Sequence, residues 1–232
     1  MENHKPTISV GIPAYNQSQY LVETVESALA QTYKPHEIIV VNDGSSDETR
    51  YIVNQYSEVK YIEQVNKGLS SARNTILMNT TGDYIYFLDS DDMMTENCLQ
   101  RIADTIAENP DADIIAPSFK CFGKYTDQVI LMPNPTLNDF KFLNGQPQNR
   151  IGYFSAIKRE ALLEIGGYSP RMTWGWEDLH LWINLLSVGK KIVTIPEVLV
   201  LYRTKENSMI HEANAHATEL TAQILKDFPA IQ

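Results

Sequence analysis

The sequence predicts an α/β fold with a mostly parallel central sheet flanked by helices. Short runs of apolar and β-branched residues alternate with helical stretches about four times between residues 7 and 119. This order of strand and helix is typical of a parallel sheet covered by helices. The most apolar of these runs ends in three carboxylates, at the edge where such sheets bind ligands.

The first half of the chain contains a cap or a stop signal beside most of its helices. Asn16 and Ser18 are expected to cap the first helix, and Ser45 with Glu48 forms a capping box for the second. An Asn-Pro pair ends the fourth helix, because the residue before proline disfavours helical backbone. The expected strands are 7–12, 36–41, 59–63, 84–88 and 114–119, and the expected helices are about 18–29, 45–56, 70–78 and 95–108.

A loop rich in Pro, Asn and Gly at residues 133–147 divides the chain into two halves, about 7–119 and about 148–203. We interpret it as a boundary within a single domain of residues 1–232. Pro196 is expected to turn a β-hairpin over 193–202. The segment 211–232 is expected to hold an amphipathic helix, over about 214–228, that packs on the body of the domain. The other elements expected in the second half are a strand at 152–157, a short helix ending at 165 and a helix at 177–188.

Composition indicates a globular protein and excludes several classes of partner. The 232 residues are 43% hydrophobic and carry a formal net charge of -10. Nucleic acid and anionic membrane surfaces attract positively charged proteins, so neither is expected as the main partner. Cys98 and Cys121 form neither a disulfide framework nor a zinc motif, which favours a cytoplasmic location. No signal peptide or transmembrane segment is expected.

Asp89, Asp91 and Asp92 are the most informative side chains in the sequence. Carboxylates this close raise one another's pKa unless a cation or a hydrogen-bonding ligand lies among them. Mg²⁺ is commonly held by one or two carboxylates together with substrate phosphates. The cluster therefore indicates a site for Mn²⁺ or Mg²⁺ that serves an anionic ligand. The alternative is a solvated turn whose carboxylates cap the next helix.

Five short blocks occur in a defined order along the chain, with a sixth downstream. They are 8–16 (ISVGIPAYN), 39–45 (IVVNDGS), 66–68 (NKG), 72–74 (ARN) and 89–92 (DSDD), followed by 176–178 (WED). This order resembles the family-two inverting glycosyltransferases, which have a GT-A fold. The resemblance covers residues 7 to about 203. It implies a nucleotide-sugar-binding half at about 7–119 and an acceptor-binding, catalytic half at about 148–203.

The resemblance implies that the first half holds the base of the nucleotide. Tyr15 would stack on a pyrimidine, and the backbone near Pro13 would contact the edge of the base. Asp43 would accept a hydrogen bond from a uracil N–H. Arg73 would lie beside the same base or offer positive charge to the donor. A UDP-sugar is therefore the expected donor.

The remaining implied roles concern the phosphates and the acceptor. Asp89 would bind the ribose hydroxyls, and Asp91 would coordinate the metal that bridges the two phosphates, with Asp92 in a supporting role. Asp178 would be the general base, and Glu177 would position the acceptor. The flanking tryptophans, Trp174 and Trp176, would offer aromatic faces to a sugar acceptor.

The sequence departs from the family near residue 203. Many members carry a histidine two residues after a Tyr-Arg pair, whereas here Tyr202 and Arg203 are followed by Thr204 and Lys205. Lys205 could face the diphosphate as a point charge, and His211 could reach the metal only if the chain folds back.

The resulting prediction is a metal-dependent inverting glycosyltransferase, a hexosyl- or N-acetylhexosaminyltransferase of polysaccharide or glycoconjugate biosynthesis. A polyprenyl-phosphate sugar synthase shares the implied fold but generally lacks the Trp-Glu-Asp block. A nucleotide-sugar binding module without turnover would not need both carboxylate sites. Residues 119–150 contain no motif that identifies the acceptor or the sugar, and no motif indicates an oligomeric state.

Overall fold

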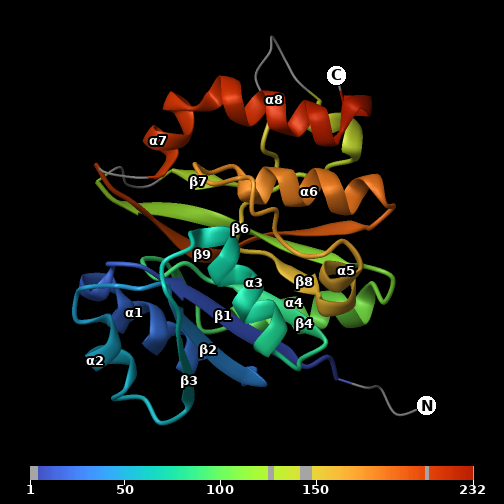
Figure 1. The fold of residues 1–232 in the computed structure, drawn as a ribbon. Coiled ribbons are helices and arrows are strands. Elements are labelled where there is room, and N and C mark those ends of the chain that lie inside the picture. The colour runs from blue at the N-terminus through green and yellow to red at the C-terminus, as the bar shows by residue number, and fades with distance from the viewer. Residues whose placement is uncertain (1–4, 125–127, 142–147, 207–208, 232) are drawn as a thin grey trace.

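The computed structural model describes residues 5–124, 128–141, 148–206 and 209–231 (Figure 1). The strands are β1 (Ile8–Ala14), β2 (Glu37–Asn42), β3 (Val59–Glu63), β4 (Tyr84–Phe87), β5 (Met93–Met94), β6 (Ile114–Gly123), β7 (Val129–Ile130), β8 (Ala156–Lys158) and β9 (Ile192–Thr204). The α-helices are α1 (Ser18–Leu29), α2 (Thr49–Val53), α3 (Leu69–Asn79), α4 (Cys98–Glu108), α5 (Arg159–Glu164), α6 (Glu177–Ser187), α7 (Met209–Ala215) and α8 (Ala217–Asp227). The two 3-10 helices are η1 (Leu137–Phe140) and η2 (Pro229–Ile231).

The strands form one curled sheet in the order β3-β2-β1-β4-β8-β6-β9-β5, with β7 paired to β6. β3, β2, β1 and β4 are parallel to one another, and β9 is parallel to β6. β8 runs antiparallel between β4 and β6. The α/β class predicted from the sequence is therefore confirmed. The sheet is parallel in the first half of the chain and mixed around β8, because a strand of the second half is inserted at its centre.

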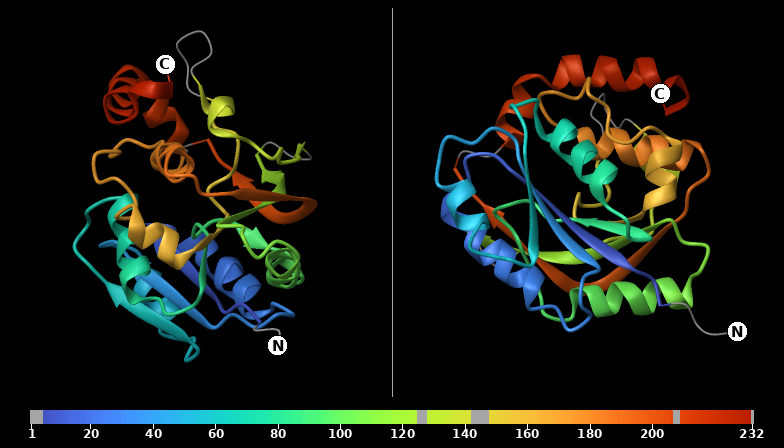
Figure 2. Two further views of the ribbon diagram at one scale, coloured as in Figure 1. Left: turned by 90° about the vertical axis from the view of Figure 1, so that its right-hand side faces the viewer. Right: turned by 60° about the horizontal axis from the view of Figure 1, so that its bottom comes forward.

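Helices cover both faces of the sheet (Figure 2). α1 and α4 bury apolar side chains such as Val25 and Leu99 against one face. α3, α5 and α6 cover the other face, with Ile76, Leu162 and Leu181 in its core. α7 and α8 lie outside α6 as a further layer (Figure 1). Two apolar layers on one sheet explain why the strands are buried on both faces.

Gly11 allows α3 to lie directly on β1. A Cβ atom at Gly11 would be 2.3 Å from Cγ2 of Ile76, which is too close for two non-bonded carbon atoms. The absence of a side chain therefore sets how closely α3 approaches the sheet. One turn earlier on α3 lies Arg73, which this contact holds near the carboxyl ends of β1 and β4.

The hairpin expected at 193–202 is wrong, because β9 continues as one strand from Ile192 to Thr204. Its register with β6 shifts where Pro117 pairs with Ile195 and Ser118 pairs with Val198. Pro196 therefore lies in an irregularity of the strand and not in a turn, which suits a residue that has no N–H for the ladder. The long pairing of β9 with β6 keeps residues 192–204 in one strand.

The expected helix caps are also wrong. α1 begins at Ser18 and α2 at Thr49, and neither has the side-chain cap that the sequence suggests. Asp47 serves both starts instead: its Oδ2 accepts a hydrogen bond from Ser18 N at 2.9 Å, and its Oδ1 accepts one from Thr49 N at 3.1 Å. Ser45 binds the β1 loop by accepting a hydrogen bond from Asn16 N at 3.0 Å.

The helix expected at about 214–228 corresponds to α8, which runs from Ala217 to Asp227 and packs Leu220 and Ile224 into the core. A separate helix, α7, precedes it. Within the described part of the chain, no helix combines the length and the apolar character needed to cross a bilayer.

Candidate active site

Two adjoining pockets lie at the carboxyl ends of the central strands. The larger, of about 450 Å³, is called the β1–β2 pocket and the smaller, of about 360 Å³, the α6 pocket. Both volumes are in the range of small-molecule sites. The residues common to both are Leu69, Asp89, Tyr202 and Met209. Two ligands could therefore meet at Asp89.

The β1–β2 pocket contains five of the six residues expected to bind the nucleotide or the metal, together with Asp92 and Lys205. The five are Pro13, Tyr15, Asp43, Asp89 and Asp91. They meet because β1, β2 and β4 are parallel neighbours whose carboxyl ends lie at one edge of the sheet. Tyr15 is 49% exposed, so its ring is available to a ligand.

Asp43 braces the loops at the rim of the β1–β2 pocket. Its Oδ1 accepts hydrogen bonds from Gln64 Nε2 at 2.7 Å and Lys67 N at 3.0 Å, and its Oδ2 accepts one from Gly68 N at 2.8 Å. The residue is 3% exposed. Asp43 thus shapes the site through the backbone of residues 67–68 while still lining the pocket.

The carboxylates of the turn at 89–92 have different partners. Asp89 pairs with Arg73, and Asp91 pairs with Lys205. Asp92 accepts hydrogen bonds from the Tyr153 hydroxyl and from a backbone N–H of β9. Burial raises the pKa of Asp89 to about 6, and burial with the charge of Asp91 raises the pKa of Asp92 well above its usual range. Asp91 is the member of the cluster whose side-chain partner, Lys205, itself lines the β1–β2 pocket.

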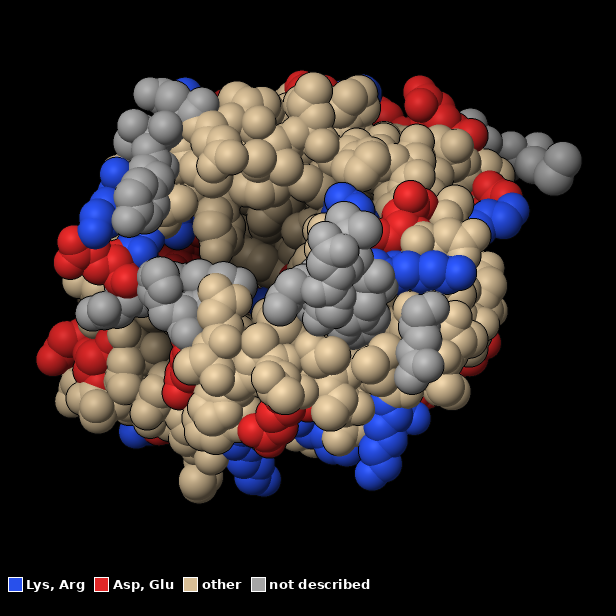
Figure 3. Space-filling view, turned by 90° about the horizontal axis from the view of Figure 1, so that it is seen from above, with Lys and Arg blue, Asp and Glu red and all other residues tan. Residues whose placement is uncertain are grey.

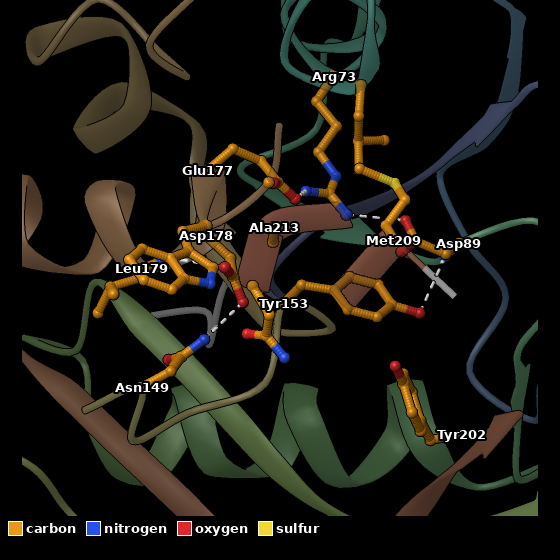
Figure 4. A pocket seen from close by; sticks show the side chains of 14 residues that line it. Arg73, Asp89, Asn149, Tyr153, Glu177, Asp178, Leu179, Tyr202, Met209 and Ala213 are labelled. Carbon is orange, nitrogen blue, oxygen red and sulfur yellow. Dashed lines mark hydrogen bonds and ion pairs between the residues drawn. The ribbon is translucent and has the colours of Figure 1, made fainter. Parts of the chain in front are cut away.

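Arg73 connects the two pockets. Its side chain has no exposed surface and forms ion pairs with Glu177 at 2.6 Å and Asp89 at 2.8 Å. The guanidinium carbon lies 5.0 Å from the centre of the Tyr153 ring and 5.3 Å from that of Tyr168. Arg73 lines the α6 pocket and not the β1–β2 pocket, because two carboxylates hold the guanidinium in the interior. Arg73 instead joins the turn after β4 to the start of α6 (Figure 4).

The start of α6 places Glu177 and Asp178 on the α6 pocket. Trp176, the residue before the helix, has a left-handed backbone with φ 56°, which is uncommon for a bulky residue and clusters at functional sites. Asp178 Oδ1 accepts a hydrogen bond from Leu179 N at 2.8 Å, and its Oδ2 accepts one from Asn149 Nδ2 at 2.7 Å. Burial and the charge of Glu177 raise the pKa of Asp178 to about 6.

The two tryptophans of this region have different positions. Trp176 lines the α6 pocket. Trp174 stacks on His216 with ring centres 4.2 Å apart, and it lines neither pocket. The residue is 37% exposed.

Three further residues of the site, Tyr153, Asn149 and Met209, carried no readable signal in the sequence, and Tyr202 was noted there only as part of the Tyr-Arg pair. Tyr153 donates a hydrogen bond to Asp92 and accepts one from Asp89 N at 3.1 Å, so it fixes the carboxylate turn. Asn149 orients Asp178, and Tyr202 and Met209 line both pockets (Figure 4). A Tyr or Asn in a loop has no spacing that would single it out.

The residues present fit a divalent cation that is shared with a bound diphosphate. Among the described residues, no three His, Cys, Asp or Glu side chains are arranged to hold a metal ion by themselves. Asp91 supplies one carboxylate facing the pocket, and Mg²⁺ sites often consist of one or two carboxylates with substrate phosphates and water. The side chain of His211 lies outside the part of the chain that is described.

Charges are interspersed on the face of the molecule seen from above, which is hollowed near its centre (Figure 3). Lys and Arg alternate with Asp and Glu without a continuous basic stripe. An anionic ligand on this face would therefore depend on local cations rather than on a broad positive field.

Two relatives are similar in sequence to this chain over different lengths. The glycosyltransferase GlyA of Streptococcus pneumoniae is 42% identical over 121 residues, which cover 50% of this chain and 17% of GlyA. TuaG of Bacillus subtilis, a glycosyltransferase named for teichuronic acid biosynthesis, is 30% identical over 224 residues, covering 90% of this chain and 83% of TuaG. The chain therefore spans most of one relative and a small part of the other.

The fold is also shared with a solved structure. Staphylococcus aureus TarS 1-349, crystallised in complex with UDP-GlcNAc, superposes with a TM-score of 0.74 at 21% identity, covering 94% of this chain and 66% of that chain. Residues 9–166 match the model of Glycosyl transferase family 2. Because this match covers more than half of the chain, the chain belongs to Glycosyl transferase family 2.

Proposed function

We propose that the protein transfers a hexosyl or N-acetylhexosaminyl group from a UDP-sugar to an acceptor hydroxyl with inversion, in polysaccharide or glycoconjugate biosynthesis. The observation that carries the proposal is the meeting of the two pockets at Asp89, with Asp91 on one side and Asp178 on the other. Inversion in one displacement needs the leaving group and the attacking hydroxyl on opposite sides of the anomeric carbon.

The β1–β2 pocket suits the nucleotide. Tyr15 offers an exposed ring to the base, and Asp43 offers an acceptor at the rim. A Mn²⁺ or Mg²⁺ ion on Asp91, when bound with the diphosphate, would neutralise charge on the leaving nucleotide. The complex of TarS with UDP-GlcNAc supports a uridine donor for a protein of this fold.

The α6 pocket suits the acceptor. A sugar hydroxyl is too weak an acid to ionise at neutral pH, so a base must take its proton during attack. Asp178 is ionised at neutral pH with a pKa raised to about 6, which makes it a better proton acceptor than an ordinary aspartate. Asn149 holds one carboxylate oxygen, and Trp176 lines the space in front of it.

Glu177 and Asp89 contribute through Arg73. The ion pairs of Arg73 fix the start of α6 relative to the end of β4. The buried Arg73 therefore fixes the distance between the base on α6 and the leaving-group site after β4. Direct attack on the anomeric carbon requires such fixed positions.

The test is Asp178→Asn, which keeps the size of the side chain and removes its basicity. Transfer should fall by about a hundredfold to ten-thousandfold, whereas UDP affinity with Mn²⁺ should stay unchanged. Asp111→Asn, on the surface beside Lys191, is the matched control. Near wild-type transfer by Asp178→Asn, or a product that retains the anomeric configuration of the donor, would contradict the mechanism.

UDP-sugar hydrolysis with and without EDTA separates this function from a binding module without turnover. A polyprenyl phosphate acceptor, tested beside soluble sugar acceptors, separates it from a polyprenyl-phosphate sugar synthase.

A further inference from the structure

Lys205 occupies the position that a cation on Asp91 would need. Its Nζ pairs with the Asp91 carboxylate and donates a hydrogen bond to Gln17 Oε1 at 3.1 Å. The ammonium also lies 5.3 Å from the centre of the Tyr20 ring. The side chains of Lys205 and Asp91 are each 18% exposed. Three partners therefore hold this lysine in a partly sheltered place, unlike a solvated surface lysine.

The chain beside Lys205 is fastened to the carboxylate turn. The backbone N–H of Arg203 donates to Asp92 Oδ1 at 2.6 Å, and Arg203 Nε donates to the carbonyl oxygen of Asp91 at 2.8 Å. The guanidinium also pairs with Glu23 and lies over two aromatic rings. Arg203 therefore has a structural role, whereas the ammonium of Lys205 pairs with the pocket-lining carboxylate of Asp91.

The charge balance of the β1–β2 pocket makes this lysine important. The pocket-lining carboxylates are those of Asp43, Asp89, Asp91, Asp92 and Glu212, of which Asp89 is paired with the buried Arg73, and the pocket-lining cations are those of Arg203 and Lys205. A diphosphate that enters so acidic a pocket meets repulsion unless a cation faces it. A divalent cation that enters alone must displace an ammonium to reach a single carboxylate.

We propose that Lys205 is a built-in counter-ion. Its ammonium occupies the Asp91 carboxylate until a nucleoside diphosphate binds, and it then moves from Asp91 to pair with the diphosphate. The divalent cation consequently enters with the diphosphate and not before it. This inference rests on the proposed donor function and adds an order of binding to it.

The proposal predicts effects of opposite sign at the two residues. Asp91→Asn removes a negative charge and releases Lys205, so it should strengthen UDP binding in EDTA and weaken UDP binding in Mn²⁺. Lys205→Met should weaken UDP binding in EDTA by about tenfold to a hundredfold, the range for a lost charge-assisted hydrogen bond. It should also let Mn²⁺ alone bind Asp91 more tightly. In the double variant, the part of the gain in EDTA that comes from releasing Lys205 should disappear.

The experiment is calorimetry of UDP in EDTA and in Mn²⁺, with electron paramagnetic resonance of Mn²⁺ alone, on the wild type, both single variants and the double variant. Lys191→Met is the matched control, because Lys191 pairs with the surface residue Asp111. Thermal unfolding checks that each variant is folded.

The outcomes separate the two proposals. If Lys205→Met changes neither the Mn²⁺ affinity nor the UDP affinity in EDTA, while Asp91→Asn still weakens UDP binding in Mn²⁺, the role of Lys205 is wrong and the donor function stands. If folded wild-type protein binds UDP in neither condition, the donor function itself fails. The counter-ion role is supported if Asp91→Asn raises and Lys205→Met lowers the UDP affinity in EDTA, and if adding Lys205→Met to Asp91→Asn removes the gain that comes from the released lysine.

Discussion

Acid should switch off turnover by protonating Asp178. The pKa of this carboxyl is raised to about 6 by burial and by Glu177, and the base works only when ionised. At pH 5 about one molecule in eleven keeps the ionised form, so kcat/KM should fall about tenfold from its plateau and tenfold more for each further pH unit. An aspartate with the ordinary pKa of about 3.9 would lose less than about a tenth of its activity at pH 5.

Substitution of Asn149 should move the pH at which kcat/KM falls, which is the acid limb of the pH profile. The Asn149 amide donates a hydrogen bond to the ionised carboxylate, so Asn149→Ala should raise the pKa of Asp178 and shift the limb to higher pH. Hydrogen bonds to charged groups are worth about 1.5–3 kcal/mol, and exposure of Asn149 to water reduces this. At about 1.4 kcal/mol per unit, we expect a shift of about half to one pH unit.

The assay is the pH profile of Mn²⁺-dependent UDP-sugar hydrolysis, with UDP affinity measured at each pH. The second measurement is needed because burial also raises the pKa of Asp89 to about 6, and Asp89 belongs to the nucleotide side. Protonation of Asp89 should weaken UDP binding, whereas protonation of Asp178 should not. If Asn149→Ala shifts UDP binding with pH but leaves the hydrolysis limb in place, the assignment of that limb to Asp178 is refuted.

Three further predictions concern specificity and packing. UDP should protect the protein against thermal unfolding better than GDP in Mn²⁺, and better protection by GDP would overturn the uracil assignment. Arg73→Met should lower the free energy of unfolding in urea by about 3–5 kcal/mol, because it leaves two carboxylates without their buried partner; a loss below about 1 kcal/mol would show that the bridge is dispensable. Gly11→Ala should cost about 1–3 kcal/mol through the contact with Ile76, and adding Ile76→Ala should remove most of the clash, which urea denaturation can compare directly.

The sequence determined the central elements because their signals are local. The strand expected at 59–63 has those bounds in the structure, and the other strands of the first half agree to within a few residues except at the far end of β6. Apolar runs closed by turn residues define a strand whatever its neighbours are. The carboxylates after β4 were equally readable, since the end of a parallel strand is a ligand-binding position in this class of fold.

The tertiary structure decided what those carboxylates contact. Arg73 and Glu177 are 104 positions apart, and Arg203 and Asp91 are 112 apart, so no local pattern predicts either contact. The same holds for Asp47, which replaces the expected caps of two helices. A hydrogen-bond or ion-pair partner is chosen by proximity in space after the sheet has assembled. Residue types and their strand positions are therefore written in the sequence, whereas the pairing of Lys205 with Asp91 exists only because β9 ends beside the turn after β4.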